Sequence, residues 1–294
     1  MKKIKLILLL LFYGSIVKAQ MPDTEIYIIA ISHSEDGEMR FGTPVNITDK
    51  AGYDNQPVFT SNSDRIIYVS QVDSNQTDLF EYDIKKETTT LLGTTEESEY
   101  SPGFVPLSNE ISVVRVDKDK SQKLYSFETN PAEAYMVIEG LDSIGYYRWI
   151  NDTILGLVVL NNGLELYIYE LTTRQYVIAD KNVGRCLMID PGSGNLLYTK
   201  PSGDGPVQIM IADKNTFDTE LFVEGYKNSE DYLITPGNEI WTGSDGLLYS
   251  MNLKKRKEWR QIADFSKTVG SFYRLAISPD GKYLALVSYK GSRP

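Results

Sequence analysis

The stretch Leu275-Ala-Ile-Ser-Pro-Asp-Gly-Lys-Tyr-Leu-Ala-Leu-Val-Ser288 consists of two short apolar runs separated by a tight turn. Pro279 fixes φ at a value suited to a turn, and Asp280 and Gly281 tolerate positive φ. Each apolar run has the length of a strand and is bounded by turn residues. The stretch therefore predicts a β-hairpin.

Related hairpins recur upstream along the chain. Their first turn residues stand at positions 61, 106, 151, 190, 235 and 278, with intervals of 45, 45, 39, 45 and 43 residues. A third strand with an aromatic or apolar pattern follows each of the first five hairpins, at 79–82, 124–127, 166–169, 208–211 and 248–251. A polar edge strand follows in turn, for example at 88–92 or 175–178. Six units of this length predict an all-β, six-bladed propeller with four-stranded blades.

The two ends of the chain complete one blade. The sixth unit ends after two strands, whereas residues 25–30 have the third-strand pattern and residues 43–48 suit an outer edge. Pairing these segments would cover edges that are otherwise exposed. We therefore expect N-terminal strands to close the last blade.

Several motifs resemble the WD-like repeats of TolB-type six-bladed propellers. They are the lead-in Asp54-Asn-Gln-Pro57, the turn Ser278-Pro-Asp-Gly281 and the hydrophobic-aromatic third strands. The resemblance covers nearly all of residues 25–294 and concerns the propeller part alone, since the N-terminal α/β domain of TolB has no counterpart in this sequence. It implies the fold, but a shared fold does not determine a shared function.

The first nineteen residues have the pattern of a secretory signal. A lysine-rich start precedes an apolar run from Leu6 to Val17, which is too short to span a bilayer, and small residues precede a cleavage position after Ala19. We expect a signal peptide at 1–19, a propeller at 20–294, and a location in the bacterial periplasm or outside the cell. No stable membrane insertion is expected after cleavage.

Composition excludes several kinds of function. The chain has 30 Lys plus Arg against 40 Asp plus Glu, and its net charge of −10 is unsuited to nucleic-acid binding. A single histidine, His33, excludes sites that need several imidazoles, and a single cysteine, Cys186, excludes an internal disulfide. No Gly-x-Ser-x-Gly motif of a serine hydrolase is present.

The starts of the six first strands provide the candidate site. Five residues before each turn stand polar or amphipathic side chains, which we expect to line the axial channel: Gln56, Ser101, Tyr146, Arg185, Glu230 and Tyr273. Two further arginines, Arg148 and Arg274, stand close by in the sequence. Arginine binds carboxylates through a planar fork of donors. The arginines either hold an anionic ligand or pair with Glu230 and Asp231. We interpret the apolar residues two before each turn, among them Trp149, as packing between blades.

Two functions are consistent with these residues. The first is a non-catalytic binding propeller that recognises a peptide, protein or glycan at its axial funnel or face, with no cofactor, catalytic residue or metal ligand assigned. The alternative is a metal-assisted hydrolase or lactonase, whose axial divalent cation would be held by oxygen ligands such as Asp54, Asn55, Glu230 and Asp231.

Overall fold

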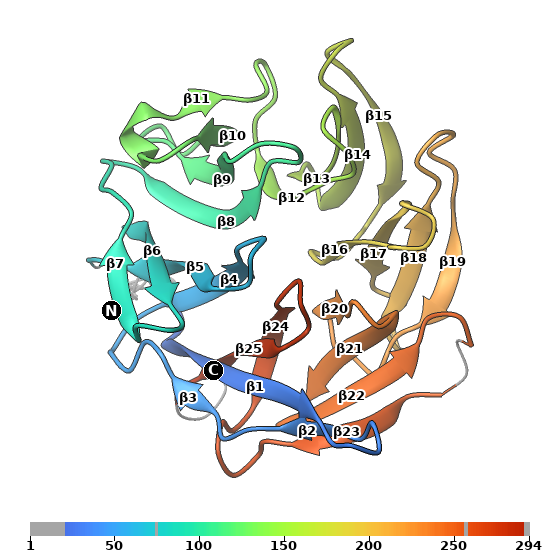
Figure 1. Cartoon of the computed structure of the whole chain (residues 1–294). Helices are drawn as coiled ribbons and strands as arrows, with labels where there is room; N and C mark the ends of the chain where they lie inside the picture. The colour runs from blue at the N-terminus through green and yellow to red at the C-terminus, as the bar shows by residue number, and fades with distance from the viewer. Residues whose placement is uncertain (1–20, 74–75, 256–257, 291–294) are drawn as a thin grey trace, which may run out of the picture.

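Six antiparallel sheets surround a central axis in the computed structural model, which describes residues 21–73, 76–255 and 258–290. Figure 1 shows the sheets arranged as a ring. The structure is a six-bladed β-propeller with four-stranded blades, as the repeat predicts. The one helical element among the described residues is a short 3-10 turn, η1 (Pro131–Glu133). No helix in these ranges is long and apolar enough to cross a membrane. The predicted signal lies outside the described residues.

Each blade runs from an inner strand at the axis to an outer strand at the rim. Blade 1 contains β4 (Asp54–Phe59), β5 (Arg65–Gln71), β6 (Thr77–Asp83) and β7 (Thr88–Leu91). Blade 2 contains β8 (Ser98–Phe104), β9 (Ile111–Val116), β10 (Gln122–Phe127) and β11 (Tyr135–Met136). Blade 3 contains β12 (Ile144–Trp149), β13 (Ile154–Leu160), β14 (Leu164–Glu170) and β15 (Gln175–Lys181).

The remaining blades follow the same order. Blade 4 contains β16 (Leu187–Ile189), β17 (Leu196–Lys200), β18 (Gln208–Ala212) and β19 (Thr219–Glu224). Blade 5 contains β20 (Tyr232–Ile234), β21 (Glu239–Ser244), β22 (Leu247–Asn252) and β23 (Arg260–Asp264). Blade 6 contains β24 (Phe272–Ile277), β25 (Tyr283–Tyr289), β1 (Thr24–His33) and, at its rim, β2 (Met39–Phe41) and β3 (Val45–Asn46).

The hairpin of blade 6 shows why the Ser-Pro-Asp-Gly sequence turns the chain. The Ser278 hydroxyl donates to Asp280 Oδ1 at 2.7 Å and accepts from the backbone N–H of Tyr283 at 2.9 Å. Gly281 has φ of +72°, a conformation that is costly for residues with a Cβ. The side chains of the turn thus satisfy backbone donors that the strands leave unpaired.

Blade 6 is closed by the N-terminal strand, as predicted. β1 pairs antiparallel with β25 from Thr24↔Tyr289 to Ala30↔Tyr283. The outer edge is divided, because β2 pairs with the end of β1 whereas β3 pairs with its middle. The predicted edge segment 43–48 therefore provides only Val45–Asn46, and the rest of the edge comes from Met39–Phe41.

The apolar core is divided among the interfaces between neighbouring blades. Six buried clusters occur in the described residues, and each joins two adjacent blades. One cluster packs Ile29 and Leu286 of blade 6 against Trp241 of blade 5. Alternating side chains of a strand point to opposite faces of its sheet, so every middle strand contributes to two interfaces.

A pair of acidic side chains lies buried between blades 1 and 2. Glu99 Oε1 accepts a hydrogen bond from Thr95 Oγ1 at 2.6 Å and lies 3.3 Å from Arg115 Nε. Burial raises the pKa of Glu99 from 4.5 to about 7, although Thr95 and Arg115 act in the opposite direction. Asp78 is hydrogen-bonded to Glu99, and burial raises the pKa of Asp78 as well.

Glu99 is expected to make stability depend on pH. Between about pH 4.5 and 7 the folded protein retains a proton on Glu99 that the unfolded chain releases, so the free energy of unfolding should fall as pH rises. This contribution is fully present below 4.5 and is lost as pH passes through about 7. Urea unfolding of Glu99→Gln should show a flatter pH dependence than the unaltered protein. An equal slope in both proteins would contradict this assignment.

Candidate functional site

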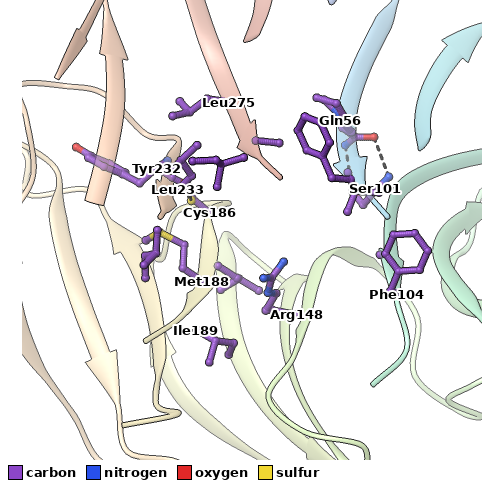
Figure 2. Close-up of a pocket in the computed structure, with 18 of the residues that line it drawn as sticks. Gln56, Ser101, Phe104, Arg148, Cys186, Met188, Ile189, Tyr232, Leu233 and Leu275 are labelled. Atoms are coloured by element: carbon purple, nitrogen blue, oxygen red, sulfur yellow. Dashed lines mark hydrogen bonds between the residues drawn. The ribbon is translucent and has the colours of Figure 1, made fainter. Parts of the chain in front are cut away.

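The six inner strands surround a central channel of about 800 Å³, which is the candidate site. Side chains of β4, β8, β12, β16, β20 and β24 line it, together with residues just outside these strands. Figure 2 shows part of this lining, with Gln56 and Ser101 on one side and Tyr232, Leu233 and Cys186 on the other. We call the end at which the inner strands begin the entry end, and the opposite end the turn end.

A polar clasp joins two blades at the entry end. The backbone N–H of Ser101 donates to Gln56 Oε1 at 2.8 Å, and Gln56 Nε2 donates to Ser101 Oγ at 3.1 Å (Figure 2). Both residues have positive φ, 55° for Gln56 and 52° for Ser101, and each lies at a bulge in its strand pair. A bulge changes the direction of a side chain. The two bulges thus direct these polar groups toward each other.

A polar and charged network connects blades 4, 5, 6 and 1. Arg185 Nη2 donates to Asp231 Oδ2 at 2.7 Å, its Nε donates to Asp231 Oδ1 at 3.3 Å, and Glu230 Oε2 lies 3.7 Å from the same guanidinium. Arg274 Nε lies 3.9 Å from Asp231, and its Nη1 donates to Asn55 Oδ1 at 2.6 Å. The carboxylate of Asp231 raises the pKa of both arginines, although burial opposes it. Arg185 and Arg274 are therefore largely neutralised within the protein.

Arg148 differs from the other two arginines. It projects from β12 into the channel (Figure 2), and no described residue forms a hydrogen bond or ion pair with its guanidinium. The side chain is open to the channel, yet the surrounding protein lowers the pKa of Arg148 by desolvation. Arginine stays charged even so. The channel thus contains a positive charge without a partner among the described residues.

The predicted site residues separate into two groups. Five of them line the channel, namely Gln56, Tyr146, Arg148, Arg185 and Arg274. Glu230 and Tyr273 are not part of the lining. Tyr273 stacks on Tyr289 with ring centroids 4.5 Å apart, and Glu230 is a partly exposed neighbour of Arg185. Of the two alternatives for the arginines, pairing with acidic side chains describes Arg185 and Arg274, whereas Arg148 forms no ion pair with a described residue.

The apolar lining of the channel is larger than the sequence suggested. Phe59, Trp149, Met188 and Leu233 are buried between blades as expected, but they also border the channel. Isoleucines one residue before three of the turns line it as well, and sequence reasoning did not single them out: Ile189, Ile234 and Ile277. The signal was present in the sequence, because these three share one position of the repeat.

The one cysteine is a structural residue of the channel wall. Cys186 Sγ lies 3.3 Å from both the backbone N and O of Tyr232 on the next blade. Burial raises the pKa of the Cys186 thiol to about 12. A thiol with such a pKa is a poor nucleophile at neutral pH.

Comparisons with known proteins support the fold. No protein-family model matches the chain, and no curated protein matches it in sequence. A putative TolB from Agrobacterium tumefaciens has a TM-score of 0.65 at 12% identity, over 92% of this chain and 99% of that one. TolB from Acinetobacter baumannii has a TM-score of 0.57 at 10% identity, over 91% of this chain and 64% of that one. The chain therefore has a TolB-like propeller fold.

A second kind of neighbour is an enzyme. An oligogalacturonate lyase in complex with manganese has a TM-score of 0.57 at 14% identity, over 89% of this chain and 82% of that one. The described residues contain no group of three or more His, Cys, Asp or Glu that could hold a metal. His33 ends β1 in blade 6, Asp54 is fully buried, and Asp231 is paired with Arg185. These acidic and imidazole side chains are therefore not gathered into one cluster among the described residues.

Proposed function

We propose that the protein is a non-catalytic binding propeller, exported to the periplasm or the cell exterior, that holds an anionic group of its ligand in the central channel. The ligand would be a peptide, a protein or a glycan, with Arg148 as the principal contact. The predicted signal at 1–19 supports export, and the TolB-like fold is consistent with a binding role.

The observation that carries this proposal is the guanidinium of Arg148, which is exposed to the channel and has no ion-pair partner among the described residues. Its donors are therefore free to bind an anion that enters the channel. Arg185 shows the alternative in the same channel, because Asp231 satisfies two of its donors. A carboxylate or phosphate entering the channel would provide Arg148 with the partner that the described chain does not supply.

Replacement of Arg148 should separate binding from folding. Arg148→Gln is expected to weaken binding of an anionic ligand by about 1.5–3 kcal/mol, the range for a hydrogen bond to a charged group. Its melting temperature should stay close to that of the unaltered protein, because the side chain makes no described hydrogen bond or ion pair. Suitable probes for calorimetry are an acidic peptide and oligogalacturonate, since the latter is the substrate named for a neighbour of the same fold.

The matched control is Arg40→Gln, which removes an equal charge from exposed β2 at the rim of blade 6. It should bind the probes as the unaltered protein does. Equal weakening in both variants would attribute the effect to net charge rather than to the channel. Binding that survives in Arg148→Gln at full strength would contradict the proposed site.

A further inference from the structure

We infer that the ligand of the channel is an amphiphile with one anionic head and an aliphatic body. The head would meet Arg148, and the body would lie against the turn end of the channel. This inference rests on the proposed binding function and its contact at Arg148, and it names an amphiphile in place of the peptide, protein or glycan. It follows from two properties of the lining, namely how few polar groups lack a partner and where the aliphatic groups lie.

Most polar side chains of the channel already have partners in the protein. Gln56 and Ser101 bond to each other, and Arg185 bonds to Asp231. At the turn end, Thr235 Oγ1 accepts from the backbone N–H of Glu239. The hydroxyls of Tyr147, Tyr232 and Ser278 also form hydrogen bonds within the protein. Among the charged side chains that line the channel in the described residues, Arg148 is thus the one without an ion-pair partner.

Aliphatic side chains surround Arg148 and extend from it to the turn end. Val58, Leu187 and Leu275 stand at the same repeat position as Arg148, three residues before their turns, and line the same channel. Nearer the turn end lie the three isoleucines that stand one residue before the turns. The turn end itself is lined by prolines from four blades: Pro106, Pro191, Pro236 and Pro279. Proline has no backbone N–H to donate. This half of the channel therefore offers few hydrogen bonds.

Such a lining favours an alkyl chain over a polymer rich in polar groups. A glycan or an extended peptide carries hydroxyls or amides that lose hydrogen bonds to water when they enter an aliphatic wall. An alkyl chain has no such groups and gains free energy from burial of its methylenes. A volume of about 800 Å³ lies within the range of small-molecule sites. One anionic head, such as a carboxylate, sulfate or phosphate, satisfies the one available guanidinium.

The test is calorimetric binding of alkyl carboxylates below their micelle concentrations. Decanoate is expected to bind, whereas acetate and decyltrimethylammonium are not. Affinity should rise with chain length by about fourfold for each methylene that is buried, which corresponds to about 0.8 kcal/mol. Decyl sulfate and decyl phosphate, tested alongside, identify which head the site prefers. Arg148→Gln should weaken decanoate binding at least about tenfold, and Arg40→Gln should leave it unchanged.

A second variant tests the aliphatic wall independently of the charge. Ile234→Thr keeps the branch at Cβ but shortens the side chain by one carbon and places a hydroxyl in the turn half of the channel, so it should reduce the gain per methylene. If decanoate bound no better than acetate, while an acidic peptide or oligogalacturonate bound through Arg148, the amphiphile inference would fail and the binding function would stand. If no anion bound in an Arg148-dependent way, both would fail. Decanoate binding that Arg148→Gln left intact would also overturn the inference.

Discussion

Removal of residues 20–48 is expected to abolish cooperative folding of all six blades. The deleted segment includes β1, which contributes four buried isoleucines: Ile26, Ile28, Ile29 and Ile31. Burial of one such side chain is worth about 1.5–3 kcal/mol, so their loss amounts to about 6–12 kcal/mol. That is comparable to the entire stability of an ordinary domain, about 5–15 kcal/mol. The truncated chain should aggregate through the exposed edge of β25.

Thermal unfolding followed by circular dichroism provides the measurement, and a chain that lacks only residues 1–19 is the control. The control should melt in one cooperative transition. A soluble form lacking 20–48 that melted at the same temperature as the control would show that the other five blades do not depend on closure of the sixth.

Trp149→Ala is expected to lower the free energy of unfolding by about 3–5 kcal/mol, the usual cost of truncating a large buried aromatic side chain. Trp149 is 8% exposed and packs in the cluster that joins blades 2 and 3. Its indole Nε1 donates to Ser112 Oγ of β9 at 2.9 Å. The substitution thus removes apolar contacts and one of the two hydrogen bonds that the buried Ser112 hydroxyl accepts, the other coming from Tyr147 Oη at 2.8 Å.

The matched control is Trp259→Ala, since Trp259 is only partly buried and lies outside the central channel. Denaturant unfolding of both variants should show the larger loss for Trp149→Ala. Equal losses would mean that the buried position of Trp149 contributes no more to stability than the partly buried position of Trp259 beside the cluster of blades 4 and 5.

The sequence predicts most of this fold because propeller blades are built from local hairpins. The turn at Ser278 and the strand pattern after it can be recognised without knowledge of distant contacts. The repeat of about 45 residues then predicts how many blades the chain forms. The divided outer edge of blade 6 could not be predicted in this way. It depends on which part of β1 pairs with each outer strand, and Met39–Phe41 is too short a strand to be recognised by composition.

The candidate site could be predicted only in outline. Equivalent repeat positions placed Gln56, Tyr146 and Arg185 around one axis, with Arg148 close by in the sequence, and this placement needs no side-chain geometry. Which arginine keeps a free charge depends on pairing across blades 46 residues apart, such as Arg185 with Asp231. Tyr273 was included by the same counting, but its ring lies outside the channel lining, where it stacks on Tyr289 and lies 5.8 Å from the guanidiniums of Arg185 and Arg274. A bulge in β24 beside Tyr273 shifts the register at this point, and a count of residues does not reveal it.

The way in which blade 6 is closed has a mechanical consequence. Thr24 pairs with Tyr289, so the described chain enters and leaves the ring at the same end of one antiparallel strand pair. Tension applied between residues 21 and 290 would load the hydrogen bonds of β1 and β25 one after another, as in a zipper, rather than all together in shear. The contact of Lys290 with Glu25, at 2.6 Å, would be among the first to bear the load. The ring would then open at this seam, while the other blades, each formed by one continuous segment, would still be intact.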